Sequence, residues 1–168
     1  MKQIIILFYV TIMISAGLRA DALPEYTLKA AYLYNFALLT DWPKGEESED
    51  LNICFYREGL GNASVALQNK MVGNRKIKVV DVATAEETKV CHMVFIPENE
   101  GRSSENVIRQ IVGTPVLIVS ENKYINDGHI TIIREGRKLA FDVSLKSLKR
   151  SNLLLSSRLL KLARKVEQ

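Results

Sequence analysis

Three short apolar runs in the middle of the chain constrain the fold more than any other feature. They span residues 51–56, 90–96 and 116–119. A continuous apolar run of this length is typical of a strand that is buried on both faces, as strands of a parallel sheet are. Segments with helical periodicity lie between the runs, so strands and helices alternate. The sequence therefore predicts an α/β domain with a mostly parallel sheet.

The other elements are predicted from local patterns. Residues 24–42 form a helical pattern in which apolar side chains recur every three or four positions, and Pro43 prevents continuation. Further helices are expected at 62–70, 103–112, 145–154 and from Ser156 or Ser157 to the end of the chain, and further strands at 75–82, 130–134 and 138–143. The last two strands flank Glu135-Gly136-Arg137, where Gly136 supplies the positive φ of a tight hairpin. The expected fold is a three-layer domain with about six strands, mostly parallel, with an antiparallel edge hairpin and flanking helices.

Residues 1–22 have the order of parts found in a secretory signal peptide. Lys2 is followed by an apolar run at 4–14 and then by the small-x-small tripeptide Ala20-Asp21-Ala22. The run is shorter than the roughly 20 residues that a membrane-spanning helix needs. We therefore expect cleavage, export and one mature domain at residues 23–168, with an uncleaved N-terminal anchor as the alternative. The formal net charge of +4 is mild and does not call for a nucleic-acid partner.

The chain has two cysteines, Cys54 and Cys91, and each lies in an apolar run expected to be a buried strand. An even number of cysteines in an exported chain favours one disulfide, and two buried free thiols are the alternative. A metal site is disfavoured. Only His92 and His129 could add ligands, and Cys91 and His92 point to opposite faces of a strand.

A glycine-containing turn follows the first apolar run. Gly59, Gly61, Asn62 and Ser64 lie between an expected strand and an expected helix, and Asp81 ends the next strand. This placement is that of a dinucleotide-binding turn, but Ser64 stands where the third glycine belongs. A plain strand-to-helix turn is the simpler interpretation, and binding of a phosphate or carboxylate at the helix start is the alternative. No cofactor is expected, and no spacing of His, Ser and acidic residues indicates hydrolytic catalysis.

Two surfaces are candidates for binding a protein partner. Arg158, Lys161, Arg164 and Lys165 occupy the polar side of the expected last helix, whose other side is apolar. Such a helix could simply pack on the sheet, lie on a membrane surface, or dock an acidic partner. In the first helix, Tyr32 and Phe36 are expected in the core. Tyr34 lies on a different face and, with Trp42, is a candidate contact residue.

Several blocks of the chain resemble the YfiR-like family of periplasmic proteins. The resemblance extends over almost the whole of the expected mature chain. Its blocks are residues 25–36 with Trp42-Pro43, then 51–54, 91–96 and 113–117, and finally the closing stretch from Gly128 through 141–143 to 156–164.

The resemblance implies a small α/β periplasmic protein, often dimeric, without enzyme activity. The best-known member of the family binds the periplasmic sensor domain of an inner-membrane diguanylate cyclase, YfiN, and holds it inactive. Its release is tied to envelope stress, to the redox state of family cysteines and to an outer-membrane lipoprotein. Cys54 and Cys91 correspond to a family disulfide, and the second cysteine pair of some relatives is missing here. We therefore expect a periplasmic repressor of cyclic-di-GMP synthesis, and a periplasmic module that binds a nucleotide or amino acid is the alternative.

Overall fold

The computed structural model describes residues 25–43, 50–57, 59–136 and 138–168. The expected signal peptide at 1–22 lies outside this part of the chain, as do residues 44–49 of the expected loop, Glu58 and Arg137. The helices are α2 (Glu25–Leu38), α3 (Glu105–Ile111), α4 (Leu145–Arg150) and α5 (Ser157–Leu160), with 3-10 helices η1 (Gly61–Leu67), η2 (Glu87–Val90) and η3 (Glu98–Glu100). The strands are β1 (Thr40–Asp41), β2 (Asp50–Tyr56), β3 (Met71–Val72), β4 (Arg75–Val82), β5 (Met93–Ile96), β6 (Leu117–Ser120), β7 (Ile130–Glu135), β8 (Lys138–Ser144), β9 (Leu154–Leu155) and β10 (Lys165–Glu167).

The main sheet has eight strands in the order β10-β8-β7-β6-β5-β2-β4-β3. Strands β4, β2, β5, β6 and β7 are mutually parallel, which confirms the predicted class of sheet. Strand β8 is antiparallel to β7, and β3 is antiparallel to β4. All six predicted strands are present, and β3 and β10 extend the sheet beyond them. The predicted hairpin of β7 and β8 is confirmed, with Gly136 at a φ of +61°, but β10 covers it, so it does not form the edge.

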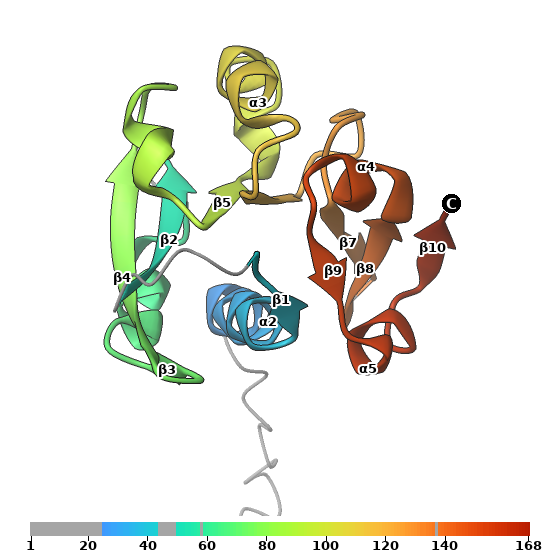
Figure 1. Cartoon of the computed structure of the whole chain (residues 1–168), viewed down its shortest axis with the longest axis horizontal. Coiled ribbons are helices and arrows are strands. Elements are labelled where there is room, and N and C mark those ends of the chain that lie inside the picture. The colour runs from blue at the N-terminus through green and yellow to red at the C-terminus, as the bar shows by residue number, and fades with distance from the viewer. Residues whose placement is uncertain (1–24, 44–49, 58, 137) are drawn as a thin grey trace, which may run out of the picture.

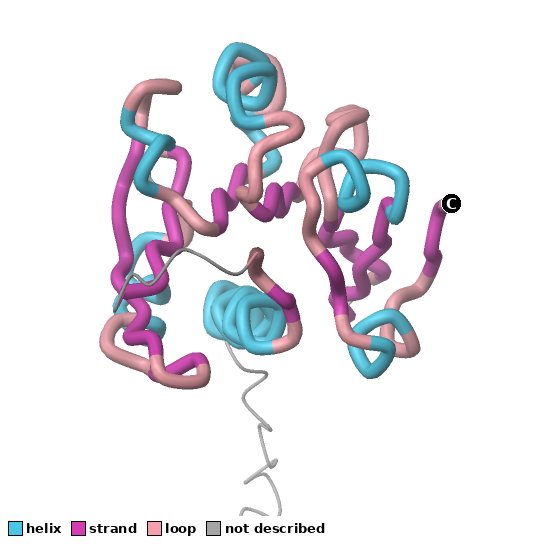
Figure 2. Tube along the Cα trace, in the orientation of Figure 1, coloured by secondary structure: helices cyan, strands magenta, loops and turns pink. Residues whose placement is uncertain are grey.

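The side chains of β2 point alternately to the two faces of the sheet, and each face has its own layer of the core. Leu51, Ile53 and Phe55 face the side that α2 covers, whereas Cys54 and Tyr56 face the side that α3 covers. Figure 1 shows the sheet curving around α2, with α3 on the opposite side of β5. Figure 2 shows the same arrangement by type of element, with helical segments on both sides of the strands. The expected three-layer architecture is therefore the observed one.

Helix α2 is the central element of one layer. Its fully buried residues Leu33, Phe36 and Ala37 recur at the helical spacing, and the Phe36 and Phe141 rings pack edge to face with centroids 5.0 Å apart. The helix ends at Leu38 rather than at Trp42, which corrects the prediction. Thr40 pairs with Leu155 in a small antiparallel sheet of β1 and β9, and these backbone hydrogen bonds replace those of another helical turn.

The C-terminal helix was predicted much too long. Ser156 does cap a helix, because its hydroxyl oxygen accepts a hydrogen bond from the Leu159 backbone N–H at 3.3 Å, but α5 ends at Leu160. The chain then becomes extended, and β10 pairs in parallel with β8. The Arg164 backbone N–H donates to the Phe141 carbonyl at 2.8 Å. Backbone hydrogen bonds to the edge of β8 thus stabilise an extended segment where the spacing of leucines and cations predicts a helix.

Two other predicted helices are shorter or tighter than expected. Residues 62–70 were expected to form an α-helix, but Gly61–Leu67 is a 3-10 helix. Helix α4 ends at Arg150 instead of residue 154, because Asn152 adopts a positive φ of +53° and Leu154 enters β9. Helix α3 agrees with the prediction at 103–112 to within a few residues.

Candidate functional site

Cys54 and Cys91 form a disulfide that joins β2 to the segment before β5, as predicted. Their Cα atoms are 5.8 Å apart, and both side chains belong to the core layer under α3. Cys54 is fully buried and Cys91 is 6% exposed. The alternative of two free thiols is therefore wrong. Cys91 lies just before β5 rather than inside it, so the bond connects a strand to a turn.

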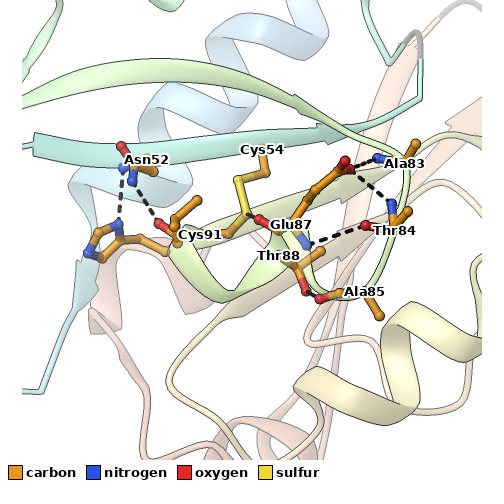
Figure 3. The surroundings of a disulfide bond; sticks show 10 residues. Asn52, Cys54, Ala83, Thr84, Ala85, Glu87, Thr88 and Cys91 are labelled. Carbon is orange, nitrogen blue, oxygen red and sulfur yellow. Dashed lines mark hydrogen bonds between the residues drawn. A yellow bond between two sulfur atoms is a disulfide. The ribbon is translucent and has the colours of Figure 1, made fainter.

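The turn that carries Cys91 is held by a dense set of hydrogen bonds (Figure 3). The Glu87 carboxylate accepts hydrogen bonds from the backbone N–H groups of Ala83 at 2.7 Å and Thr84 at 3.1 Å, which lower the pKa of Glu87. On the other side of the disulfide, the Asn52 amide donates to the Val90 carbonyl at 2.7 Å. These bonds and the disulfide fix η2 against β2.

The two histidines occupy equivalent places in the sheet. His92 precedes β5, and its Nδ1 accepts a hydrogen bond from the Asn52 backbone N–H at 3.0 Å. His129 precedes β7, and its Nδ1 accepts from the Ile118 backbone N–H at 2.9 Å. Each ring thus continues the hydrogen-bonding ladder of a neighbouring strand. His129 is 2% exposed, and burial lowers its pKa to about 4. Both histidines therefore act as structural residues at strand starts.

The described ranges hold neither a metal-binding cluster nor a membrane-spanning helix. Within them, no group of three or more His, Cys, Asp or Glu side chains is placed to hold a metal ion. No helix there has both the length and the apolar character needed to cross a bilayer.

Tyr34 and Trp42 lie in different surroundings. The Tyr34 hydroxyl donates to the Met71 carbonyl in β3 at 3.0 Å, and the Lys70 ammonium lies 5.2 Å from the centre of the Tyr34 ring. The Trp42 ring packs edge to face on His92, with centroids 6.2 Å apart. Both side chains are half-buried against the core, so each presents only part of its ring to a partner.

The four predicted basic contact residues fall into two groups. Arg164 Nε donates to the Asp142 carboxylate at 2.8 Å, and Arg164 also pairs with Glu135 at 3.3 Å. The hydrogen bond with Asp142 raises the pKa of Arg164. Lys165 pairs with Glu167 at 2.5 Å, which raises the pKa of the lysine. Arg158 and Lys161, on and just after α5, are exposed. The basic helical face that was to unite all four is absent, because α5 is a single turn.

The predicted glycine turn leads from β2 into the 3-10 helix η1. Gly61 adopts a φ of +51°, and the Ser64 hydroxyl donates to the Gly61 carbonyl at 2.7 Å. Asn62 is exposed on the same 3-10 helix. These bonds close the turn on itself, and a 3-10 helix of this length offers no α-helical N-terminus for a phosphate.

Of the residues in that turn, Gly59 alone lines a broad groove along the carboxyl ends of the parallel strands. The groove has a volume of about 1760 Å³ and is lined by Arg57 after β2, Glu98 after β5 and Glu121 after β6. Glu25, Lys29 and Tyr26 of α2 form another part of its wall. This edge of an α/β sheet is a common place for ligands.

An ion cluster in which Lys29 and Glu121 are largely buried links α2 to the sheet at this groove. The Lys29 ammonium pairs with the Glu25 carboxylate at 2.7 Å and also with Glu121, and Arg134 pairs with Glu25. The Lys29 side chain is 9% exposed. Burial opposes its charge, but the hydrogen bonds to Glu121 and Glu25 prevail and raise the pKa of Lys29. This cluster was not predicted from the sequence. The spacing of Glu25 and Lys29 was a usable signal, whereas nothing local indicated Glu121.

Comparison with known proteins agrees with the resemblance seen in the sequence. The model of the YfiR/HmsC-like family matches residues 26–164, from the first turn of α2 to the residue before β10. A search of curated proteins found no match. The family match spans both core layers, the disulfide and strands β1 to β9. The chain therefore belongs to the YfiR/HmsC-like family.

Proposed function

We propose that this protein is a periplasmic regulator without catalytic activity of its own. It binds the periplasmic region of an inner-membrane signalling protein, a diguanylate cyclase, and lowers cyclic-di-GMP by holding the cyclase inactive. Its release would be tied to envelope stress and to an outer-membrane lipoprotein partner, and the family resemblance adds a homodimer as a further expectation. The observation that carries the proposal is the family match over residues 26–164. The expected signal peptide at residues 1–22 and the disulfide of Cys54 and Cys91 support an oxidising compartment.

The proposal is tested by expressing a tagged copy in its own host, crosslinking the envelope and identifying the membrane proteins that are captured. Recovery of a cyclase with a periplasmic sensor domain is the expected result. Deleting the gene should then raise the level of cyclic-di-GMP, and adding back the wild-type gene should return that level to normal. A well-expressed protein that captures no cyclase, or a deletion that leaves cyclic-di-GMP unchanged, would contradict the proposal.

A second candidate function is binding of a small ligand, and the groove at the carboxyl ends of β2, β5 and β6 favours it. Gly59 lines this groove, whereas Gly61, Asn62 and Ser64 of the predicted turn do not. Thermal unfolding with nucleotides and amino acids tests this function. A ligand at 100 times its dissociation constant stabilises the protein by about 2.7 kcal/mol. No shift with any of these ligands would remove this candidate.

A further inference from the structure

Two exposed tyrosines lie on the wall of the groove at the carboxyl ends of the parallel strands. Tyr26 in the first turn of α2 is 56% exposed, and Tyr124 after β6 is 77% exposed. Among the described residues, no other Phe, Tyr or Trp side chain is exposed to this degree. Aromatic side chains beside a few polar groups are the usual lining of a ligand site.

An ion pair holds the segments of the two tyrosines together. The Lys29 ammonium, one helical turn after Tyr26, pairs with the carboxylate of Glu121, three residues before Tyr124. The same ammonium lies 5.3 Å from the centre of the Tyr26 ring, and the Lys123 ammonium lies 5.2 Å from the centre of the Tyr124 ring. Each ring is therefore contacted by a lysine of its own segment, while much of its surface stays open to the groove.

The loop that carries Tyr124 is held by its own hydrogen bonds. The Tyr124 backbone N–H donates to the Asn122 side-chain oxygen at 2.9 Å, and the Asn122 backbone N–H donates to the Ser120 hydroxyl oxygen at 2.8 Å. The Asn122 amide also donates to the Glu98 carbonyl at 3.4 Å, and a side chain at Gly101 would collide with this amide. The loops after β5 and β6 thus pack closely, which reduces the entropic cost of binding a ligand against Tyr124.

The charges of the groove favour an uncharged ligand. Four of the five cations in its described lining pair with carboxylates of this chain: Lys29 with Glu25 and Glu121, Arg57 with Glu100, Arg134 with Glu25, and Arg164 with Asp142. A phosphate or carboxylate group on a ligand would have to displace these partners. The carboxylates and the exposed amides of Asn99 and Asn126 instead offer acceptors and donors to the hydroxyl groups of a neutral ligand.

The size of the groove favours an elongated ligand. Its volume of about 1760 Å³ exceeds the roughly 300–1,000 Å³ of a site for one small molecule. The lining extends from α2 and the loops after β2, β5 and β6 to Asp142 in β8 and Glu167 in β10. A linear oligosaccharide has the matching properties. The C–H bonds on the face of a pyranose ring pack against the negative face of an aromatic ring, and its hydroxyl groups point to the sides.

We propose that this groove binds a neutral linear oligosaccharide. Sugar rings stack on Tyr26 and Tyr124, and sugar hydroxyl groups form hydrogen bonds with the carboxylates and amides of the lining. This inference goes beyond both functions above, because it does not depend on regulation of a cyclase and gives the groove a class of ligand other than nucleotides and amino acids.

The test is calorimetric titration of the purified protein with cellohexaose, chitohexaose and maltohexaose. We expect saturable binding of at least one of them. Tyr26→Ala and Tyr124→Ala should each weaken this binding about tenfold, since each loses one stacking contact. Tyr26→Phe and Tyr124→Phe keep the rings and should bind nearly as the wild type does. The matched control is Leu154→Ala, because Leu154 is 68% exposed and does not line the groove, so its binding should be unchanged.

Each other outcome overturns the proposal. Failure of the wild type to bind any of the three hexasaccharides contradicts it directly. Binding that both alanine variants leave unchanged would place the sugar outside the groove. If a nucleotide, an amino acid or an extended peptide binds instead and depends on both tyrosines, the groove is a binding site but the class of ligand is wrong. None of these results bears on capture of a cyclase, so the proposed regulation is judged separately. Because both side chains are exposed, we expect all of these variants to fold.

Discussion

The Nε2 atom of His129 lies 2.9 Å from the hydroxyl oxygen of Ser151, and this contact joins the start of β7 to the end of α4. The other ring nitrogen, Nδ1, accepts the Ile118 backbone N–H, so the proton of the neutral ring is on Nε2 and is donated to Ser151. The ring is almost fully buried. His129 therefore ties three elements together only while it is uncharged.

Stability is expected to fall on mild acidification because of His129. Burial lowers its pKa from 6.5 to about 4 in the folded protein, and the positive charge of Arg150 adds to the effect. Between about pH 6.5 and pH 4, the unfolded chain therefore binds more protons than the folded protein does. The free energy of unfolding is at its full value above about pH 6.5 and decreases by about 3 kcal/mol as the pH falls to about 4. Urea unfolding at pH 7, 6, 5 and 4.5 measures the decrease.

The control for this prediction is His129→Asn. An asparagine side-chain oxygen can accept the Ile118 N–H in place of Nδ1 but does not titrate. The variant should be less stable than wild type at pH 7 and should show a flatter dependence on pH above 4.5. If the free energy of unfolding of the variant depends on pH as steeply as that of the wild type, the pH dependence comes from other groups.

Breaking the ion cluster around the largely buried Lys29 should destabilise the protein. Lys29→Met removes the ammonium between Glu25 and Glu121 and leaves the Glu121 carboxylate, 13% exposed, without its partner. We expect a loss of about 3 kcal/mol in the free energy of unfolding. Adding Glu121→Gln removes the stranded charge and should recover part of the loss. Equal stability of wild type and Lys29→Met would show that the cluster contributes nothing.

The disulfide should contribute strongly to stability. Cys54 and Cys91 are separated by 37 residues, and closing such a loop stabilises a fold by about 4 kcal/mol in the chain-entropy model. Reduced wild type and the Cys54→Ala, Cys91→Ala variant should therefore unfold at similar, lower urea concentrations. The alanine variant should not respond to reductant. A midpoint that reduction leaves unchanged would refute this prediction.

Charge at Tyr34 should weaken partner binding without unfolding the protein. Tyr34 is half-buried, so Tyr34→Asp places a carboxylate at the surface between α2 and β3. Tyr34→Phe is the matched variant. It loses only the hydrogen bond to Met71, worth about 1 kcal/mol, and should bind the cyclase domain normally. If Tyr34→Asp unfolds instead, Tyr34 is a core residue and not a contact residue.

Much of this fold could be predicted because its signals are local. The apolar runs of β2, β5 and β6, the hairpin glycine Gly136 and the helical spacing in α2 depend only on neighbouring residues. The two cysteines also indicated their own pairing, since no other partner exists in the chain. These features follow from burial and backbone geometry that short segments encode by themselves.

Tertiary structure decided the ends of the first and last helices and the composition of the candidate surfaces. The helical patterns extend to Trp42 and to Val166, but distant strands offer hydrogen-bond partners to Thr40 and to β10, and the backbone pairs with them instead. Those pairings place Arg164 beside Asp142 and Leu154 beside Asp41. The sequence by itself thus determined the strands, the hairpin and the disulfide. Which cations pair with carboxylates of this chain depended on contacts between segments far apart in the sequence, such as Arg164 with Asp142, and no local pattern predicts such contacts.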